Sequence, residues 1–173
     1  MDFAFDAVRA LGDYRSALRS AALRLKHRGQ EPLAAALAEL LWQGFGEELA
    51  AVGFDTVLNT PMHWRRRLRR RTNSPELLAE SLARRLGIEH LPRCLACCRL
   101  RQSQDMLTRS QRFANVRGAF DVRRGYQLGG ARLLVVDDVM TTGATAGELA
   151  RVLKRAGAAT VWIVVLARSA GNR

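Results

Sequence analysis

The chain has 173 residues, 48% of them hydrophobic, and a formal net charge of +12 at pH 7. This length predicts one domain, residues 1–173, with a sizeable hydrophobic core, and the sequence has no run of about eighteen apolar residues that would predict a transmembrane helix. The N-terminal stretch lacks the basic start and apolar centre of a signal peptide, so a cytoplasmic protein is expected. The excess of Lys and Arg favours a polyanionic partner, either a nucleic acid or a phosphorylated small molecule.

Two helices and a strand are predicted in the first third of the chain. Apolar side chains recur at helical spacing across residues 6–28, which predicts one helix. A second helix is expected over 32–51, because Pro32 is suited to a first helical turn. A short buried strand then follows within 54–61 and is closed by Pro61.

The middle of the chain is strongly basic. Residues 61–73 form a predicted loop in which six of the seven residues 65–71 are Arg. A helix is expected over 74–86, since Pro75 is suited to its first turn. A strand is then expected within 90–100.

The rest of the chain alternates between strand and helix patterns after a polar segment. Residues 101–119 have no clear period, which predicts a long, mobile loop. The elements expected after it are a short strand at 120–123, a buried strand at 133–136, a helix at 145–156 and a strand at 160–167. This alternation predicts an α/β fold with a mostly parallel sheet flanked by helices on both faces, and ligands bind such sheets at the carboxyl ends of the strands.

The most informative stretch is residues 133–145, LLVVDDVMTTGAT. An apolar run typical of a buried parallel strand ends in Asp137 and Asp138. The loop 140–144 can direct backbone N–H groups and Thr hydroxyls at one point, and a helix starting near Thr145 directs its positive end there. Such a loop binds phosphate, and the two acids beside it can hold sugar hydroxyls or Mg²⁺. The combination indicates a phosphorylated ribose.

This stretch resembles the phosphoribosyl pyrophosphate (PRPP) signature of type I phosphoribosyltransferases. The matching positions are Asp137, Asp138, Thr141, Thr142, Gly143 and Thr145. The resemblance implies a type I phosphoribosyltransferase-like fold in which Asp137 and Asp138 are catalytic residues and Mg²⁺ ligands. It also implies that the 5′-phosphate of PRPP is bound by Met140, Thr141, Thr142, Gly143, Ala144 and Thr145.

Three further stretches resemble the ComF family, a branch of phosphoribosyltransferase-like proteins linked to competence. Residues 14–41 resemble its opening helix pair, 61–79 its pyrophosphate loop and the next helix, and 104–120 its flexible loop. The resemblance implies pyrophosphate-binding residues, which are Lys26, His63, Arg65, Arg70 and Arg71. It also implies flexible-loop residues, which are Gln104, Arg112 and Asn115.

The chain departs from the ComF pattern in three places. The family usually begins with a four-cysteine zinc module, and we expect none here. Its pyrophosphate loop usually reads Arg-Gly-Phe-Asn-Gln, where residues 70–74 read Arg-Arg-Thr-Asn-Ser. The missing glycine argues against close backbone approach to pyrophosphate, so the extra Arg71 either binds the same charge through its side chain or faces solvent. The flexible loop often has Thr three residues before Gln104, and Arg101 takes that place.

Three cysteines, Cys94, Cys97 and Cys98, lie close together. A structural zinc site needs four ligands, and the sequence offers no second CxxC or His pair. We therefore expect no zinc, and interpret the cysteines as small buried residues on a strand in a reducing compartment.

Two functions stay open. The first is Mg²⁺-dependent phosphoribosyl transfer from PRPP to or from a nitrogenous acceptor, whose identity is open because Thr141 replaces the Asp general base of hypoxanthine-type members. The second is a non-catalytic ComF-type competence protein that uses the fold as a nucleotide- or DNA-binding module. The arginines of 65–71 fit a pyrophosphate loop, a DNA contact or a solvated loop. No membrane span is expected, and a homodimer stays open.

Overall fold

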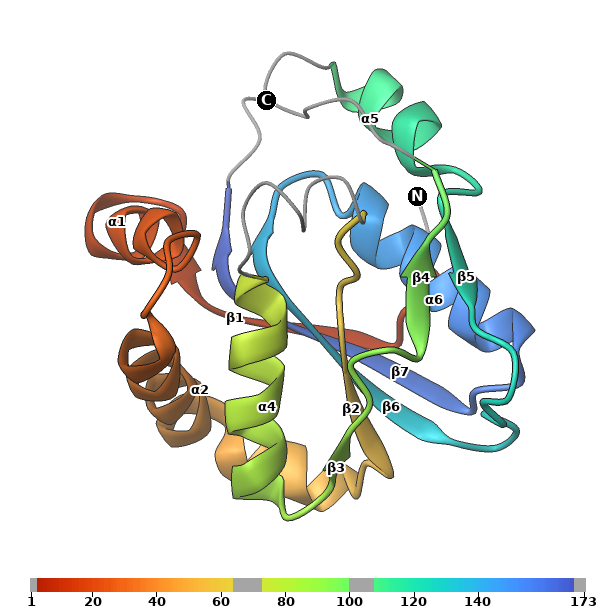
Figure 1. Cartoon of the computed structure of the whole chain (residues 1–173), viewed down its shortest axis with the longest axis horizontal. Helices are drawn as coiled ribbons and strands as arrows, with labels where there is room; N and C mark the ends of the chain where they lie inside the picture. Colours follow the sequence, from red (N-terminus) through yellow and green to blue (C-terminus); the bar gives the residue numbers. More distant parts are fainter. Residues whose placement is uncertain (1–2, 64–72, 100–107, 170–173) are drawn as a thin grey trace.

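The computed structural model describes residues 3–63, 73–99 and 108–169. Within these residues, five strands form one sheet in the order β1-β7-β6-β2-β3, and every neighbouring pair is parallel (Figure 1). In chain order these strands are β1 (Ala7–Asp13), β2 (Thr56–Asn59), β3 (Glu89–His90), β6 (Arg132–Met140) and β7 (Thr160–Arg168). The predicted α/β fold with a mostly parallel sheet is confirmed.

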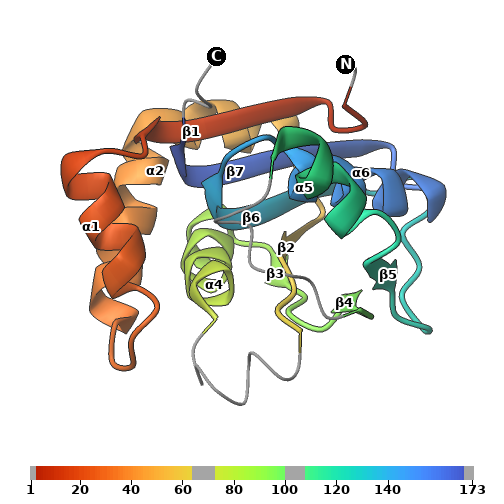
Figure 2. The same ribbon diagram turned by 90° about the horizontal axis from the view of Figure 1, so that it is seen from above.

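Helices lie on both faces of this sheet (Figures 1 and 2). One face is covered by α1 (Ser16–Arg24), α2 (Glu31–Val52) and α4 (Ser74–Leu86). The other face is covered by α5 (Arg109–Val116), α6 (Ala144–Arg155) and a small antiparallel pair, β4 (Leu95–Cys97) and β5 (Phe120–Val122). The predicted helices at 32–51, 74–86 and 145–156 therefore agree with α2, α4 and α6.

The central strand β6 is buried on both faces. Leu133 and Val135 lie in the hydrophobic core that contains α6. Leu134 and Val136 lie in the core that contains α2 and α4. Because both faces are covered, residues 133–136 of the strand are all apolar and buried rather than alternately so, as the sequence predicts.

The first predicted helix, 6–28, is wrong over its first half, which forms β1. This strand pairs with β7 along its whole length, so its backbone hydrogen bonds to the sheet replace those of a helix turn. Its side chains alternate, since Val8 and Ala10 pack in the α6 core while Leu11 packs in the α2–α4 core. A short apolar segment fits both the 3.6-residue spacing of a helix and the two-residue spacing of a strand. Pairing with an available sheet edge decides between them.

The predicted loop 101–119 is also wrong in part, because α5 occupies its second half. The helix starts with a capping box, in which the Thr108 hydroxyl accepts from the Gln111 N–H and the Gln111 side chain accepts from the Thr108 N–H. Phe113 anchors the helix by packing against the α6 core. The Thr-x-x-Gln spacing is a helix-start signal that the polar composition hides.

The three cysteines differ in exposure, so the prediction of three buried residues is wrong. Cys94 is buried, Cys97 at the end of β4 is partly buried, and Cys98 is exposed. The cause is that β4 pairs with β5 outside the main sheet and ends before Cys98. Burial raises the pKa of the Cys94 thiol to about 11, which makes it an inert thiol.

None of the helices in the described ranges is both long and apolar enough to cross a membrane.

Candidate functional site

The candidate site lies where β6 extends beyond its neighbour β2. Pairing with β2 ends at Asn59 and Val136, whereas pairing with β7 continues to Met140. The prediction that the strand ends at Val136 is therefore wrong, because β7 is long enough to pair with it through the two acids. One edge of β6 is left open beside Asp137, at the carboxyl edge of the sheet.

The two adjacent acids lie on opposite faces of β6. Successive side chains of a strand alternate, so Asp137 continues the face of Val135 and Asp138 continues the face of Val136. Asp137 lines a pocket, and Asp138 is not among the residues that line it. A small ligand group in this pocket therefore meets Asp137, and the joint role of the two carboxylates stays a prediction.

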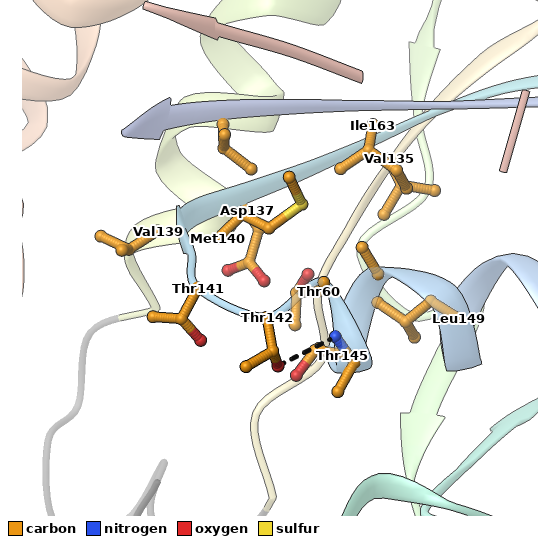
Figure 3. Close-up of a pocket in the computed structure, with 14 residues that line it drawn as sticks. Thr60, Val135, Asp137, Val139, Met140, Thr141, Thr142, Thr145, Leu149 and Ile163 are labelled. Carbon is orange, nitrogen blue, oxygen red and sulfur yellow. Dashed lines mark hydrogen bonds between the residues drawn. The ribbon is translucent and has the colours of Figure 1, made fainter. Parts of the chain in front are cut away.

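The predicted phosphate loop lines the same pocket. All six of its residues contribute to the lining, together with Asp137, Thr60 and an apolar floor (Figure 3). The loop residues are Met140, Thr141, Thr142, Gly143, Ala144 and Thr145. The floor residues include Val135, Leu149 and Ile163. The structure thus brings together the acid and the loop that the sequence predicts to act on one ligand.

Gly143 gives the loop its shape. Its φ of 77° is in the left-handed region, and a Cβ there would come within 2.9 Å of the Phe3 ring. As N-cap of α6 it supplies no side-chain hydrogen bond, while the next residue, Ala144, donates its N–H to Thr142 Oγ1 (3.4 Å). The positive end of the α6 dipole therefore faces the pocket, which favours an anion.

The ionised form of Asp137 is disfavoured in the pocket. Burial, followed by the neighbouring Asp138 carboxyl group, raises the pKa of Asp137 to about 8. The Thr60 hydroxyl lies close enough to lower that pKa slightly, yet Thr60 Oγ1 makes no hydrogen bond of normal geometry within the described residues. A cation or a hydroxyl donor at this position would stabilise the ionised carboxylate.

Both ends of the basic segment are fixed beside this site. His63 is buried at its start. At its end, Ser74 Oγ donates to the carbonyl of Leu25 (3.2 Å), which brings Lys26 to the start of α4. Two of the five predicted pyrophosphate residues, His63 and Lys26, thus lie near opposite ends of this segment. The other three, Arg65, Arg70 and Arg71, lie outside the described residues.

The predicted flexible-loop residues are described only in part. Arg112 and Asn115 are on α5, whereas Gln104 lies outside the described residues. Helix α5 is connected to the α6 side of the site through ring packing of Phe113 on Phe3 (6.2 Å between centroids). Its C-terminal end accepts hydrogen bonds from Arg99, which donates to the Asn115 carbonyl (3.4 Å).

The sequence interpretation misses polar residues that flank the site. Asn59 ends β2, and its Oδ1 pairs with His90 Nε2 (2.9 Å), while Thr60 follows it into the pocket. Glu148 on α6 accepts the Gly118 N–H (2.6 Å). The available signal was two polar residues at the end of an apolar strand, the same signal that identified the acids of β6.

The comparisons with known proteins agree with this geometry. Residues 76–173 match the phosphoribosyl transferase domain, so the chain belongs to the family of proteins with a phosphoribosyltransferase domain. Within it, the chain is similar to ComF-type proteins. It is 34% identical over 163 residues to DNA utilization protein YhgH of Salmonella typhi, covering 92% of this chain and 71% of that protein. It is 26% identical over 169 residues to competence protein F of Haemophilus influenzae, covering 95% and 74%.

Two solved structures share the fold. The chain superposes on glutamine PRPP amidotransferase from B. subtilis with a TM-score of 0.51 and 21% identity. It superposes on an allosteric regulatory enzyme of purine biosynthesis with a TM-score of 0.55 and 20% identity. Each match covers 83% of this chain and 30% of the other, so the chain spans less than a third of either protein. At this identity the likeness concerns the fold alone.

Proposed function

We propose that the chain binds PRPP with Mg²⁺ and carries out phosphoribosyl transfer to or from a nitrogenous acceptor. The observation that carries this proposal is one pocket lined by the loop 140–145, by the start of α6 and by Asp137. The loop and helix start suit a 5′-phosphate, and Asp137 suits the ribose beside it. The family membership supports the same ligand class.

The remaining roles follow from this orientation of the ligand. The pyrophosphate of PRPP would extend from the ribose toward the basic segment, whose ends are His63 and the contact between Ser74 and Leu25. We assign pyrophosphate binding to Lys26 and His63, and to Arg65, Arg70 and Arg71. The 101–119 segment, with Gln104, Arg112 and Asn115, would cover the reacting atoms and exclude water.

Mg²⁺ fits this pocket only as a partner of the substrate. Among the described residues no three His, Cys, Asp or Glu side chains gather into a metal site. Mg²⁺ commonly takes one or two protein carboxylates and completes its shell with phosphate oxygens and water, and Asp137 is one such carboxylate. When bound, the ion would neutralise charge on the departing pyrophosphate.

The proposed reaction needs no covalent bond to the protein. The C1–O bond to pyrophosphate breaks and the pyrophosphate leaves with the electron pair. A nitrogen lone pair of the acceptor forms the C1–N bond, and the nitrogen then loses a proton to water. Cationic side chains near the pyrophosphate stabilise the departing charge. Thr141 is not a general base, so the acceptor must attack with a nitrogen that needs little assistance.

A pyrophosphate-release assay tests this function. The protein is incubated with PRPP, Mg²⁺ and a panel of nitrogenous bases and amines, and release is expected only with a matching acceptor. Gly143→Ala should lower release, because a Cβ at this positive φ strains the loop that lines the pocket and comes within 2.9 Å of the Phe3 ring. Gly87→Ala is the matched control, since Gly87 also has a positive φ but has open space around it. Acceptor-independent background in every combination would contradict transfer.

A second candidate function is engagement of DNA by a basic surface. Within 91–99 and 108–127 the acidic residues are limited to Asp121. The exposed arginines of these ranges are Arg93, Arg99, Arg117, Arg123 and Arg124. Such a surface suits a phosphate backbone, and the Salmonella relative is named a DNA utilization protein.

Salt dependence separates this candidate from PRPP binding. If these arginines contact DNA, each Arg→Ala change should reduce the slope of log affinity against log salt by about one unit. The same approach applied to the arginines of 65–71 distinguishes a pyrophosphate loop from a DNA contact, and no effect on either ligand would indicate a solvated loop. As pyrophosphate ligands, one or two of them should affect PRPP affinity and the rest should not. A similar loss of DNA affinity in every Arg→Ala variant, with unaltered PRPP affinity, would favour the DNA-binding module.

A further inference from the structure

Thr60 is a buried residue whose hydroxyl group has no partner in the described part of the protein. It follows β2 directly, and its N–H donates to the Val136 carbonyl (2.9 Å), which fixes its backbone against β6. Its side chain is 8% exposed, and its Oγ1 makes no hydrogen bond there. Buried hydroxyl groups nearly always have a partner, so a group outside the protein is the natural candidate.

The polar neighbours of Thr60 on the same strand are all paired. The Thr56 hydroxyl donates to the Glu89 carbonyl (2.7 Å) and ties β2 to β3. Asn59 pairs with His90 through its Oδ1. These groups have structural partners, whereas the Thr60 hydroxyl makes no hydrogen bond of normal geometry with the residues that the structure describes. The difference follows position, because Thr60 is the one of these three residues that lines the pocket.

Within the pocket, the Thr60 hydroxyl can donate a hydrogen bond to a ligand and the Asp137 carboxylate can accept one from it. Figure 3 shows both side chains pointing into the space bounded by the loop and the start of α6. An ionised carboxylate only accepts hydrogen bonds, whereas a hydroxyl can also donate one. The complementary ligand group must therefore donate to Asp137 and accept from Thr60.

An alcohol group meets this requirement with a single oxygen. A phosphate oxygen only accepts, and the Asp137 carboxylate would repel it. A divalent cation can bind the Asp137 carboxylate, but it has no lone pair with which to accept the Thr60 proton. The pair therefore favours a sugar hydroxyl over either ion.

We propose that Thr60 is a specificity residue for ribose: its Oγ1 donates to the ring hydroxyl oxygen at C2 or C3 whose proton Asp137 accepts. This inference rests on the proposed function, because it takes the ligand of the loop 140–145 to be a phosphorylated ribose. It makes the site selective for ribose 5-phosphates over analogues that lack the contacted hydroxyl, since removing that hydroxyl leaves buried polar groups unpaired.

Calorimetric titration of the full chain with ribose 5-phosphate and its 2-deoxy and 3-deoxy analogues tests the assignment. Thr60→Val should weaken ribose 5-phosphate binding about 3- to 10-fold, the loss of one hydrogen bond. Thr60→Ser should restore most of the affinity. For one of the two deoxy analogues, Thr60→Val should cost nothing further, which identifies the contacted hydroxyl. Thr56→Val is the matched control and should lower thermal stability while leaving affinity unchanged.

Two results would overturn the assignment: unchanged ribose 5-phosphate affinity in Thr60→Val, or an equal loss for all three sugars. Thr60→Val is close to isosteric and removes an unpaired group, so its thermal unfolding should match or exceed that of the wild type. Thr60→Ala is a second variant without the hydroxyl. Failure of the wild type to bind either PRPP or ribose 5-phosphate would instead remove the proposed function, so the two failures are distinguishable.

Discussion

The two edges of the parallel sheet treat their polar groups differently. At the amino edge, Asp55 Oδ2 accepts the N–H of Arg132 (2.7 Å), where β6 begins. There too, Asp6 Oδ2 accepts the N–H of Val161 (2.6 Å) near the start of β7. At the carboxyl edge, Asp137 lies in a pocket beside an unpaired hydroxyl. The two acids of the amino edge tie neighbouring parts of the sheet together, whereas Asp137 accepts the N–H of the next residue, Asp138 (2.8 Å), and faces the pocket.

The pKa values express the same contrast. Burial would raise the pKa of Asp6, but hydrogen bonds from Lys154 and Val161 outweigh it and lower that pKa. Burial and a like charge raise the pKa of Asp137. Asp6 therefore stabilises the fold when ionised, whereas Asp137 destabilises it when ionised. A carboxylate that costs stability is typical of a binding group whose partner comes from outside.

The largest effect is expected at Glu148. It tests whether the hydrogen-bond partners of a carboxylate, rather than its position near the site, decide whether it stabilises the fold. Glu148 is on α6 near the site, yet its side chain is 8% exposed and accepts from the Gly118 N–H and from Arg151. Glu148→Ala should lower the free energy of unfolding by about 1–3 kcal/mol, because a buried donor loses its partner. Thermal or urea unfolding measures this.

Glu148→Gln is the matched control, because its side-chain oxygen can still accept from Gly118 while the charge on Arg151 is left unpaired. Glu148→Gln should lower the free energy of unfolding clearly less than Glu148→Ala does. Equal losses would assign the effect to charge rather than to the hydrogen bond, and no loss in either variant would break the comparison.

An effect of opposite sign and similar size is expected at Asp137. Its folded-state pKa is raised to about 8 from an ordinary value of 3.8, so between these pH values the unfolded state releases a proton that the folded state keeps. Its contribution therefore becomes more unfavourable as pH rises through this window. Asp137→Asn should stabilise the ligand-free protein by at least about 1 kcal/mol near neutral pH. Below pH 3.8, the ordinary pKa of Asp, the substitution should not change the stability. A melting temperature below that of the wild type at neutral pH would refute this.

The smallest effect is expected at Asp6, with the reverse pH dependence. Since the folded-state pKa of Asp6 is lowered, its contribution is present above the unfolded-state pKa and is lost as pH falls through the folded-state value. Asp6→Asn should melt slightly below the wild type near neutral pH, and the two curves should converge in acid. Differential scanning calorimetry across pH measures both aspartates, and parallel trends at Asp6 and Asp137 would erase the contrast between the edges.

The sequence predicts the carboxyl edge better than the rest of the chain. The loop 140–145 and Asp137 are predictable because strand, acid, loop and helix follow one another locally. The strand β1 is not, because its partner β7 is about 150 residues away and a short apolar segment fits both periods. The opposite orientation of Asp137 and Asp138 depends on β6 continuing past Val136, which only the length of β7 determines.

The role of Thr60 illustrates a second limit. Polar residues at the end of β2 indicate a candidate site, but the sequence does not show which Thr faces a ligand, and Thr56 at the start of the strand is a structural residue. What distinguishes the two is a missing partner, and a missing hydrogen bond is a property of the packed structure.

The central claim is that Asp137 at the carboxyl edge binds a ligand, whereas the acids of the amino edge hold the fold together. Calorimetric titration of PRPP with Mg²⁺ into wild type, Asp137→Asn and Asp6→Asn tests it most directly. Wild type and Asp6→Asn should bind with equal affinity, and Asp137→Asn should bind at least about tenfold more weakly, as expected for a lost charged hydrogen bond. Equal PRPP affinity in all three proteins would contradict the account.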